Sequence, residues 1–230
     1  MNNRYFCAKE NGKLNYPHTI LTGFGFLASS IAWAIYDPYI TKILNRLLTS
    51  SATITSWSTK LNEAFPKLAE FAAANGEDVA TAAGGITLVP LFIGIIMTFD
   101  NIFGVIFQPT FGKLSDNTHS RFGKRRPYVI FGAPISAVLF AIIPLVAVKS
   151  GSLPLTMLFI ILFVFIMSLW RAPVVALMPD LTPSEIRSEG NAVINLMGGL
   201  GGAIGLFAGT IVTAIYCAVT GANSKADDFD

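Results

Sequence analysis

GKLSDNTHSRFGKRRP, residues 112–127, is a short polar and basic stretch between two long apolar segments. It contains the basic run Lys124-Arg125-Arg126, with Arg121 close by. By the positive-inside rule, a short basic loop between two bilayer-length apolar segments is expected on the cytoplasmic side of a membrane. The loop therefore sets the predicted orientation of the segments before and after it.

The composition is typical of a helical membrane protein. Hydrophobic residues make up 53% of the 230 residues and charged residues only 13%, whereas soluble domains have about 25% charged residues. The 20 glycines fit this class as well, because small residues let membrane helices approach closely. The net charge is only +2, with the basic residues gathered in one loop, so no nucleic-acid partner is predicted. We predict an all-α polytopic membrane protein whose surroundings are the lipid bilayer.

Apolar runs of about 20 residues, the length that crosses a bilayer, divide the chain. We predict a cytoplasmic N-terminus over 1–17, a transmembrane domain over 18–219 and a polar tail over 220–230. No cleavable signal peptide is visible, so the first apolar run is expected to be retained. The domain is predicted to contain five spans and a long outer loop at 44–85; the spans are 18–43, 86–111, 128–148, 155–178 and 191–219. We expect the plasma (inner) membrane as the location.

Two local patterns outside the spans predict helices. Apolar residues of 58–74 recur at helical spacing, which indicates an amphipathic surface helix that Pro66 would kink or split. The segment Thr182-Pro183-Ser184-Glu185 has the pattern of a helix start, with Thr182 as the N-cap. His18 and His119 have no partner residues in the sequence pattern, and a solvated position is expected for both. Cys7 and Cys217 are expected too far apart for a disulfide, and no metal-ligand spacing is present.

Ionisable residues inside the predicted spans point to a function. A charge at the bilayer centre costs about 2.5–3.5 kcal/mol, so Asp37, Asp100 and Arg171 each need a partner or a water-filled cavity. Asp100, Gly104 and Gln108 are spaced four residues apart and share one helical face, with Asn101 next to it. An acid can carry a proton or a cation and the amides can bond hydroxyls, so this face is suited to a solvated substrate path.

Structural alternatives remain open for these residues. Asp100 and Arg171 could form a buried ion pair that only joins two helices. Asp37 could be solvated or cap a helix, and Gln108 could bond a neighbouring helix. A glycine stripe in the last span predicts close helix packing, or else a surface on which the helix slides; it consists of Gly198, Gly202, Gly205 and Gly209.

The loop Gly112-Lys113-Leu114-Ser115-Asp116, followed by Arg121-Phe122-Gly123-Lys124-Arg125-Arg126-Pro127, resembles the loop between helices 2 and 3 of the major facilitator superfamily. More narrowly, it resembles glycoside–pentoside–hexuronide:cation symporters and sucrose:proton symporters. Gln108-Pro109, Arg171-Ala172 and Asp180-Leu181 are similar to the sucrose branch. The superfamily fold has two halves of about six helices each. The resemblance therefore implies the N-terminal half of such a carrier, a fragment or split product that needs a C-terminal half from the same or another chain.

The resemblance also implies roles for single residues. A cytoplasmic gate motif is expected to hold helix ends together through charge-assisted bonds, with Asp116 at a helix N-terminus; its residues are Gly112, Asp116, Arg121, Gly123, Lys124, Arg125 and Arg126. The melibiose-type branch has an acid where Arg171 stands. A sodium site is therefore not expected, and the coupling ion is expected to be a proton carried by Asp100 or Asp37. No other cofactor and no metal are expected.

These inferences predict a secondary active transporter that takes up a sugar or glycoside with protons by alternating access. In this prediction Asp100 takes up and releases the proton, and Arg171 tunes its proton affinity. The predicted binding or coupling residues are Asp37, Asp100, Asn101, Gln108 and Arg171. One alternative is an uncoupled carrier or an exporter of another solute. Another is a non-transporting membrane subunit or a truncated remnant. An enzyme is not predicted, because no nucleophile–base pair is visible.

Overall fold

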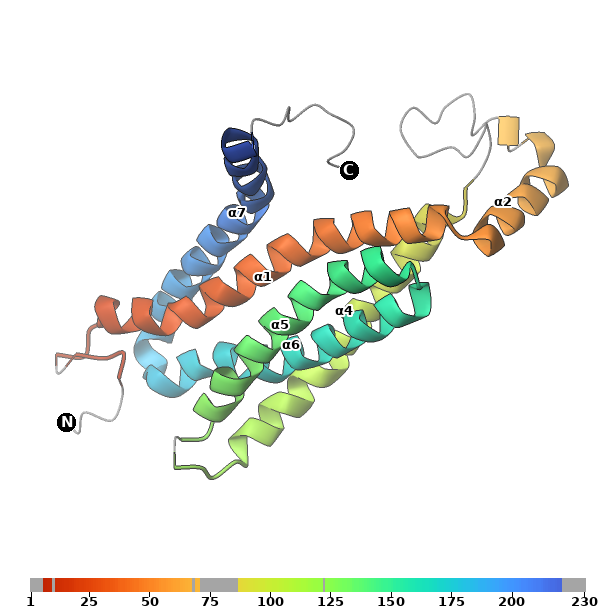
Figure 1. The fold of residues 1–230 in the computed structure, drawn as a ribbon. Helices are drawn as coiled ribbons and strands as arrows, with labels where there is room; N and C mark the ends of the chain where they lie inside the picture. Colours follow the sequence, from red (N-terminus) through yellow and green to blue (C-terminus); the bar gives the residue numbers. More distant parts are fainter. Residues whose placement is uncertain (1–5, 10, 68, 71–86, 122, 221–230) are drawn as a thin grey trace. The chain divides into compact units, whose positions relative to one another are not determined.

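The computed structural model describes residues 6–9, 11–67, 69–70, 87–121 and 123–220, and the regular structure in these ranges is helical (Figure 1). The elements are α1 (Tyr16–Thr49), α2 (Ala52–Ala64), α4 (Val89–Asp116), α5 (Arg126–Ser150), α6 (Leu153–Leu181), the short 3-10 helix η1 (Ser184–Ile186) and α7 (Arg187–Thr220). Extended pairing within the described ranges is limited to one isolated bridge between Ala8 and Leu14. The predicted all-α class is confirmed.

In the part of the chain that the structure describes, five helical segments are long and apolar enough to cross a membrane. They are α1, α4, α5, α6 and the segment Ser184–Val219, which covers all of α7 except its last residue. The five predicted spans fall on these helices, and most of the helices extend beyond the predicted ends. The largest difference is in α1, which continues to Thr49 although the span was predicted to end at Ile43. The chain is a multi-pass membrane protein.

The chain forms two compact units. The first contains Met1–Pro38, Phe111–Ile130 and Trp170–Asp230, and the second contains Tyr39–Thr110 and Phe131–Leu169. Helices α1, α4, α5 and α6 therefore contribute residues to both units.

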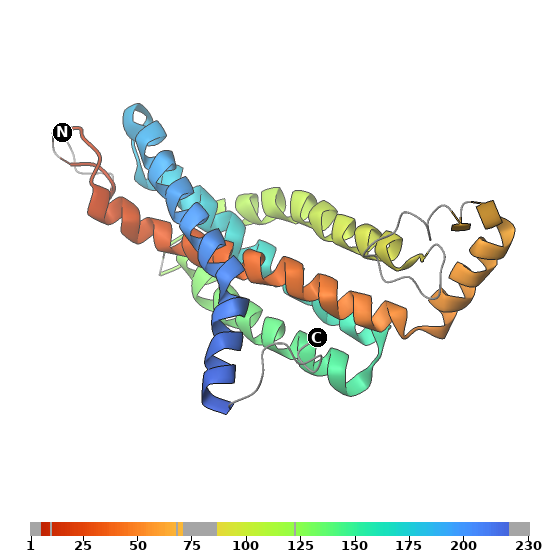
Figure 2. The ribbon, with the colours of Figure 1, turned by 90° about the horizontal axis from the view of Figure 1, so that it is seen from above.

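Glycines let α7 pack closely against α1 in the first unit (Figure 2). A Cβ atom at Gly201 would lie 2.5 Å from the carbonyl oxygen of Leu27, and one at Gly205 would lie 2.6 Å from the Cβ of Ala34. Gly202, which was predicted to belong to this stripe, has no such neighbour within 4 Å. The prediction was wrong for Gly202, because one residue changes the direction by about 100° around a helix. The contact is made by Gly198, Gly201 and Gly205.

The surface helix predicted over 58–74 begins earlier, and it is split directly before Pro66, as the sequence predicts. Residues 66, 67, 69 and 70 are helical again after the break. Helix α2 starts at Ala52 and ends at Ala64, and its C-cap residue Phe65 has φ −129° and ψ 64°. The end before Pro66 follows from the proline, which disfavours helical backbone at the residue before it. Residues 71–74 of the prediction lie outside the described residues. In the second unit, the hydroxyl of Ser58 accepts a bond from the Leu88 N–H at 3.1 Å, which ties α2 to the start of α4.

Thr182 does not cap a helix, contrary to the prediction. The residue at the N-cap of η1 is Pro183, without a side-chain bond, and α7 begins only at Arg187. Thr182 is fully buried, and its hydroxyl donates to the sulfur of Met178 at 3.1 Å. Burial beside Met178 thus turns the hydroxyl away from the backbone N–H groups that a cap would satisfy.

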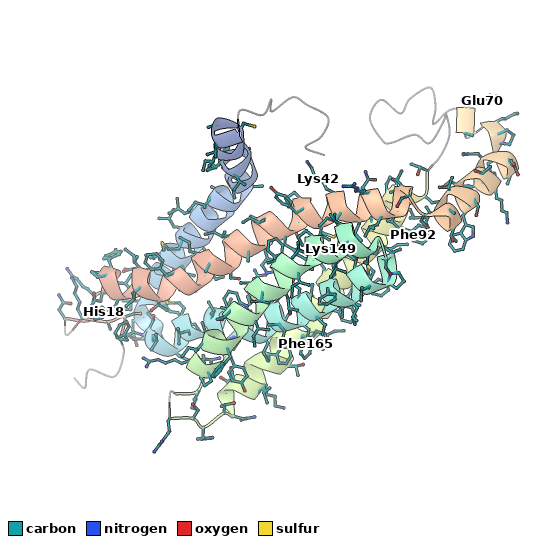
Figure 3. The ribbon with its side chains drawn as sticks, in the orientation of Figure 1. His18, Lys42, Glu70, Phe92, Lys149 and Phe165 are labelled. Carbon is teal, nitrogen blue, oxygen red and sulfur yellow. The ribbon has the colours of Figure 1, made fainter. Side chains whose placement is uncertain are left out.

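The described part of the N-terminal segment packs on the first unit. The N–H of Cys7 donates to the carbonyl oxygen of Leu181 at the end of α6, with an N–O distance of 3.0 Å. The ring of His18, labelled in Figure 3, stacks on Phe6 with 4.1 Å between ring centroids. Nδ1 of His18 also lies 2.8 Å from the Phe6 carbonyl oxygen. The prediction of a merely solvated His18 was wrong, whereas His119 is exposed, with its Nδ1 3.0 Å from the carbonyl oxygen of Asn117.

Candidate functional site

The basic loop supplies one buried cation, Arg125, which stands directly before α5 in the first unit. Its guanidinium makes three side-chain bonds: Nε to Oδ2 of Asp180 at 2.6 Å, Nη2 to Oδ1 of Asp116 at 2.7 Å and Nη1 to Oγ of Ser115 at 3.0 Å. The Arg125 side chain is only 9% exposed, whereas the two aspartates are about half exposed. Arginine suits this position, because its planar fork of N–H donors can serve several acceptors at once.

The cluster joins the ends of three helices. Asp116 is the last residue of α4, and Asp180 is the second-last residue of α6. Both acids therefore lie at helix C-termini, and the predicted place of Asp116 at a helix N-terminus was wrong. The helix dipoles favour a cation at these ends. Arg125 supplies that cation and also neutralises the two acids. The favourable interaction with the helix dipoles is therefore made by Arg125 and not by Asp116.

The other residues of the predicted gate motif are placed differently. Arg121, Lys124 and Arg126 are exposed and form no ion pair with any residue that the structure describes. Gly123 has φ +94°, a left-handed conformation that favours glycine and turns the chain into Arg125. Gly112 accepts a bond from the Ser115 hydroxyl through its carbonyl oxygen at 2.8 Å, and this helps to orient the serine toward Arg125.

A second polar cluster of the first unit lies within the membrane-spanning segments. Asp37 of α1 and Arg171 of α6 interact electrostatically. The guanidinium carbon of Arg171 lies 5.6 Å from the ring centroid of Trp33, within cation–π range. Trp33 also makes an edge contact with Tyr36 at 5.3 Å between centroids. An acid, a cation and an indole from α1 and α6 are thus gathered inside the span region.

The remaining predicted site residues belong to α4 in the second unit. A Cβ atom at Gly104 would lie 3.4 Å from the amide nitrogen of Gln108, so these residues share a face as predicted. Asn101 is exposed and its amide donates to the carbonyl oxygen of Met97 at 2.8 Å, one turn back along α4. The side chain of Asp100 lies outside what the structure describes, so its predicted role and its alternative pairing with Arg171 stay predictions.

An aromatic row runs beside these residues in the second unit. Phe99, Phe103 and Phe107 of α4 follow one another with centroid distances of 6.5 and 5.7 Å. Phe107 meets Phe165 of α6 edge to face at 5.2 Å, and Phe165 is labelled in Figure 3. The row packs α4 against α6, next to the face of α4 that carries Gly104 and Gln108.

Sequence reasoning missed three contributors to these clusters. Asp180 was noted only as part of the branch resemblance, Ser115 was named only within the loop that resembles the superfamily, and Trp33 was not singled out. The serine and the aspartate could have been found by asking which groups satisfy a buried arginine near helix ends. Trp33 stands four residues before Asp37, which places both on one face of α1.

Comparison with known proteins gives a family and two relatives. The family model described as "Major Facilitator Superfamily" matches residues 18–217. The human "Membrane-associated transporter protein" is 29% identical over 153 residues, which cover 57% of this chain and 28% of that protein. The mouse protein of the same name is 27% identical over 151 residues, with the same shares covered. The match thus spans just over a quarter of each relative's length. No solved structure matches the chain.

Proposed function

Because this chain belongs to the major facilitator superfamily, we propose that it is part of a secondary active transporter, which takes up a sugar or glycoside with protons by alternating access. The observation that carries this proposal is the polar cluster between α1 and α6, in which the Arg171 guanidinium carbon lies 5.6 Å from the Trp33 ring centroid and interacts electrostatically with Asp37. Charged groups inside membrane spans are costly and mark substrate or ion pathways. The family membership and the transporter names of the relatives support a carrier rather than an enzyme.

In this proposal, protonation of an acid in the span region couples the proton to the solute. Asp37 is the better supported acid, because it interacts with a cation on another helix. Loss of its charge removes the attraction to Arg171, so the two helices can rearrange as the cavity changes sides. Asp100 of α4 is the second acid that could carry the proton. Asn101 and Gln108 contribute amide groups that bond solute hydroxyls. The motifs that resemble those of proton-coupled sugar symporters support this choice of solute and coupling ion.

The Arg125 cluster acts in this proposal as a gate on the cytoplasmic side. Its three bonds tie helix ends of the first unit, and these ends adjoin the basic loop that the positive-inside rule assigns to the cytoplasm. The N-terminus then also lies in the cytoplasm, and the carrier lies in the plasma (inner) membrane. Helices beyond those described complete the translocation path, and they come from the same chain or from a partner chain.

The test is transport by the natively expressed protein, purified from its own membrane and reconstituted in proteoliposomes. Its intact mass is measured first: about twice the calculated 24.7 kDa places the remaining helices in the same chain, and a mass near that value requires a partner chain. Uptake of labelled sucrose and methyl α-glucoside is then followed with and without an inside-alkaline pH gradient. We expect accumulation above equilibrium only with the gradient. Equilibration without accumulation would indicate an uncoupled carrier, and no flux of any sugar would indicate a non-transporting subunit or a carrier of another solute.

A further inference from the structure

Among the residues that the structure describes, three buried polar atoms of the first unit have no hydrogen-bond partner. They are Oγ of Ser29 and Nε1 of Trp33 on α1, and Nε of Arg171 on α6. Ser29 is the most enclosed, with 1% of its surface exposed. A polar group without a partner costs several kcal/mol in a membrane span, where no bulk water reaches it. Such groups therefore indicate an occupant that supplies the missing bonds.

Contacts between α1 and α6 place the three atoms along one seam. A Cβ atom at Gly25 would lie 3.1 Å from Cγ1 of Val174, and eight residues later the Trp33 ring faces Arg171 at 5.6 Å. Ser29 follows Gly25 by four residues and precedes Trp33 by four, so all three share one face of α1. Ser29 therefore lies between the two contacts, beside the stretch of α6 that runs from Arg171 to Val174.

Nε1 of Trp33 and Nε of Arg171 find no acceptor among the residues that the structure describes. The indole N–H and the guanidinium N–H groups are donors only, so they cannot bond to each other. A serine in a helix commonly bonds the carbonyl oxygen one turn back, as the hydroxyls of Thr19 and Thr22 do elsewhere on α1. Ser29 does not make that bond. The arrangement thus presents unmet donors to an occupant that must supply acceptor oxygens.

The charges at the seam indicate what kind of molecule supplies those oxygens. Arg171 contributes one positive charge, and Asp37, four residues after Trp33 on α1, contributes a negative charge that interacts with it. The two charges balance, so the seam offers no net attraction to an anion. A neutral polyhydroxylated molecule fits better, because its oxygens accept from the three donors while a hydroxyl can donate to the Asp37 carboxylate.

We propose that Ser29, Trp33 and Arg171 form a donor-lined subsite that binds one or two oxygens of a neutral sugar, and that the Trp33 N–H selects the oxygen it bonds. This inference rests on the proposed transport function and names further residues of its binding site. The face of the indole is taken by the Arg171 guanidinium, so Trp33 contributes through its N–H.

The test compares sugar binding by the wild type and Trp33→Phe, both as the natively assembled protein in proteoliposomes. The probes are methyl α-glucoside and its series of monodeoxy derivatives, measured by equilibrium binding. Phenylalanine keeps a ring beneath Arg171 but lacks the N–H. Loss of one buried hydrogen bond is expected to raise Kd about 3- to 10-fold. One deoxy derivative should lack the oxygen that the Trp33 N–H contacts. The wild type should bind this derivative more weakly than the parent sugar. Trp33→Phe should bind the derivative and the parent sugar with equal Kd, because it has no N–H to lose a bond.

Trp57→Phe is the matched control, because Trp57 is 48% exposed on α2 of the second unit; its Kd values should equal those of the wild type. Unchanged Kd in Trp33→Phe, or the same rise for every derivative, would mean that water alone satisfies the donor and would overturn the subsite. If Trp33→Phe does not fold, Ser29→Ala is read by the same criteria. A wild type that binds none of these sugars overturns the proposed substrate as well, and this result is visible before any variant is made.

Discussion

Nε of Arg125 lies 2.6 Å from Oδ2 of Asp180, which joins two residues that are 55 positions apart in the chain. Because Arg125 also bonds Asp116 at 2.7 Å, one guanidinium connects the end of α4, the start of α5 and the end of α6. The arginine is nearly buried and depends on these partners to offset the loss of hydration. The cluster therefore acts as a structural joint: it holds three helix ends of the first unit together, and this role does not depend on which solute is transported.

Asp180→Asn should lower the stability of the protein. The amide keeps the shape of the carboxylate but removes its charge, so Arg125 loses one of two anionic partners. Because Asp180 is half exposed, solvent screens the pair, and we expect a loss of about 0.5–1.5 kcal/mol, measured by thermal unfolding in detergent micelles. Arg121→Ala is the control, because Arg121 is exposed and should change stability by less than about 0.5 kcal/mol. Equal losses in both variants would contradict a specific role for the joint.

Gly201→Ala and Gly202→Ala should behave in opposite ways. The new methyl group at position 201 would meet backbone of α1, 2.5 Å from the carbonyl oxygen of Leu27, and backbone cannot move aside cheaply. We expect a destabilisation of about 1–3 kcal/mol. At position 202 no such atom lies within 4 Å, so the higher helix propensity of alanine should leave stability unchanged or raise it by up to about 1 kcal/mol. Thermal unfolding of the two variants side by side measures the difference, and a reversed order would mean that α7 has another rotation.

Thr182→Val should have little effect on stability. Valine keeps the shape of the buried side chain and removes a hydroxyl that donates only to the sulfur of Met178, a weak acceptor. Loss of an N-cap costs about 0.5–2 kcal/mol. We expect a smaller loss of stability here, less than about 0.5 kcal/mol, because valine has the same shape and leaves only the weak sulfur acceptor unpaired. Chemical denaturation in mixed micelles provides the measurement. A loss above about 1 kcal/mol would restore the capping role that the sequence pattern predicts.

Asp37→Asn should abolish uphill sugar uptake and preserve exchange. An amide cannot take up and release a proton at physiological pH, so the pH gradient would no longer drive accumulation, whereas solute can still cross by counterflow. The measurement is accumulation against counterflow in proteoliposomes, with Lys149→Ala at the exposed end of α5 as the control, which Figure 3 labels. Asp100→Asn is assayed in parallel. Uphill uptake that survives in Asp37→Asn and fails in Asp100→Asn would assign the coupling proton to Asp100.

Part of the site could be predicted from the sequence because it depends on local composition. The run Lys124-Arg125-Arg126 marks the loop, but only the structure distinguishes the buried Arg125 from its exposed neighbours. The same limit applies to Thr182, whose sequence pattern is that of a cap and whose environment is the side chain of Met178. A pattern states which bonds a residue can make, and the neighbouring elements decide which bond it makes.

The sequence by itself determined the helical class, the five membrane-spanning segments and the family. These properties follow from local physics, because a span needs about 20 apolar residues and a helix satisfies its own backbone within the bilayer. Only the tertiary structure decided that Arg125 meets Asp180, that Gly201 rather than Gly202 contacts α1, and that Trp33 faces Arg171. Such contacts depend on the rotation of each helix about its axis, which changes by about 100° per residue. Packing against the neighbouring helices sets that rotation, and no single segment of the sequence contains it.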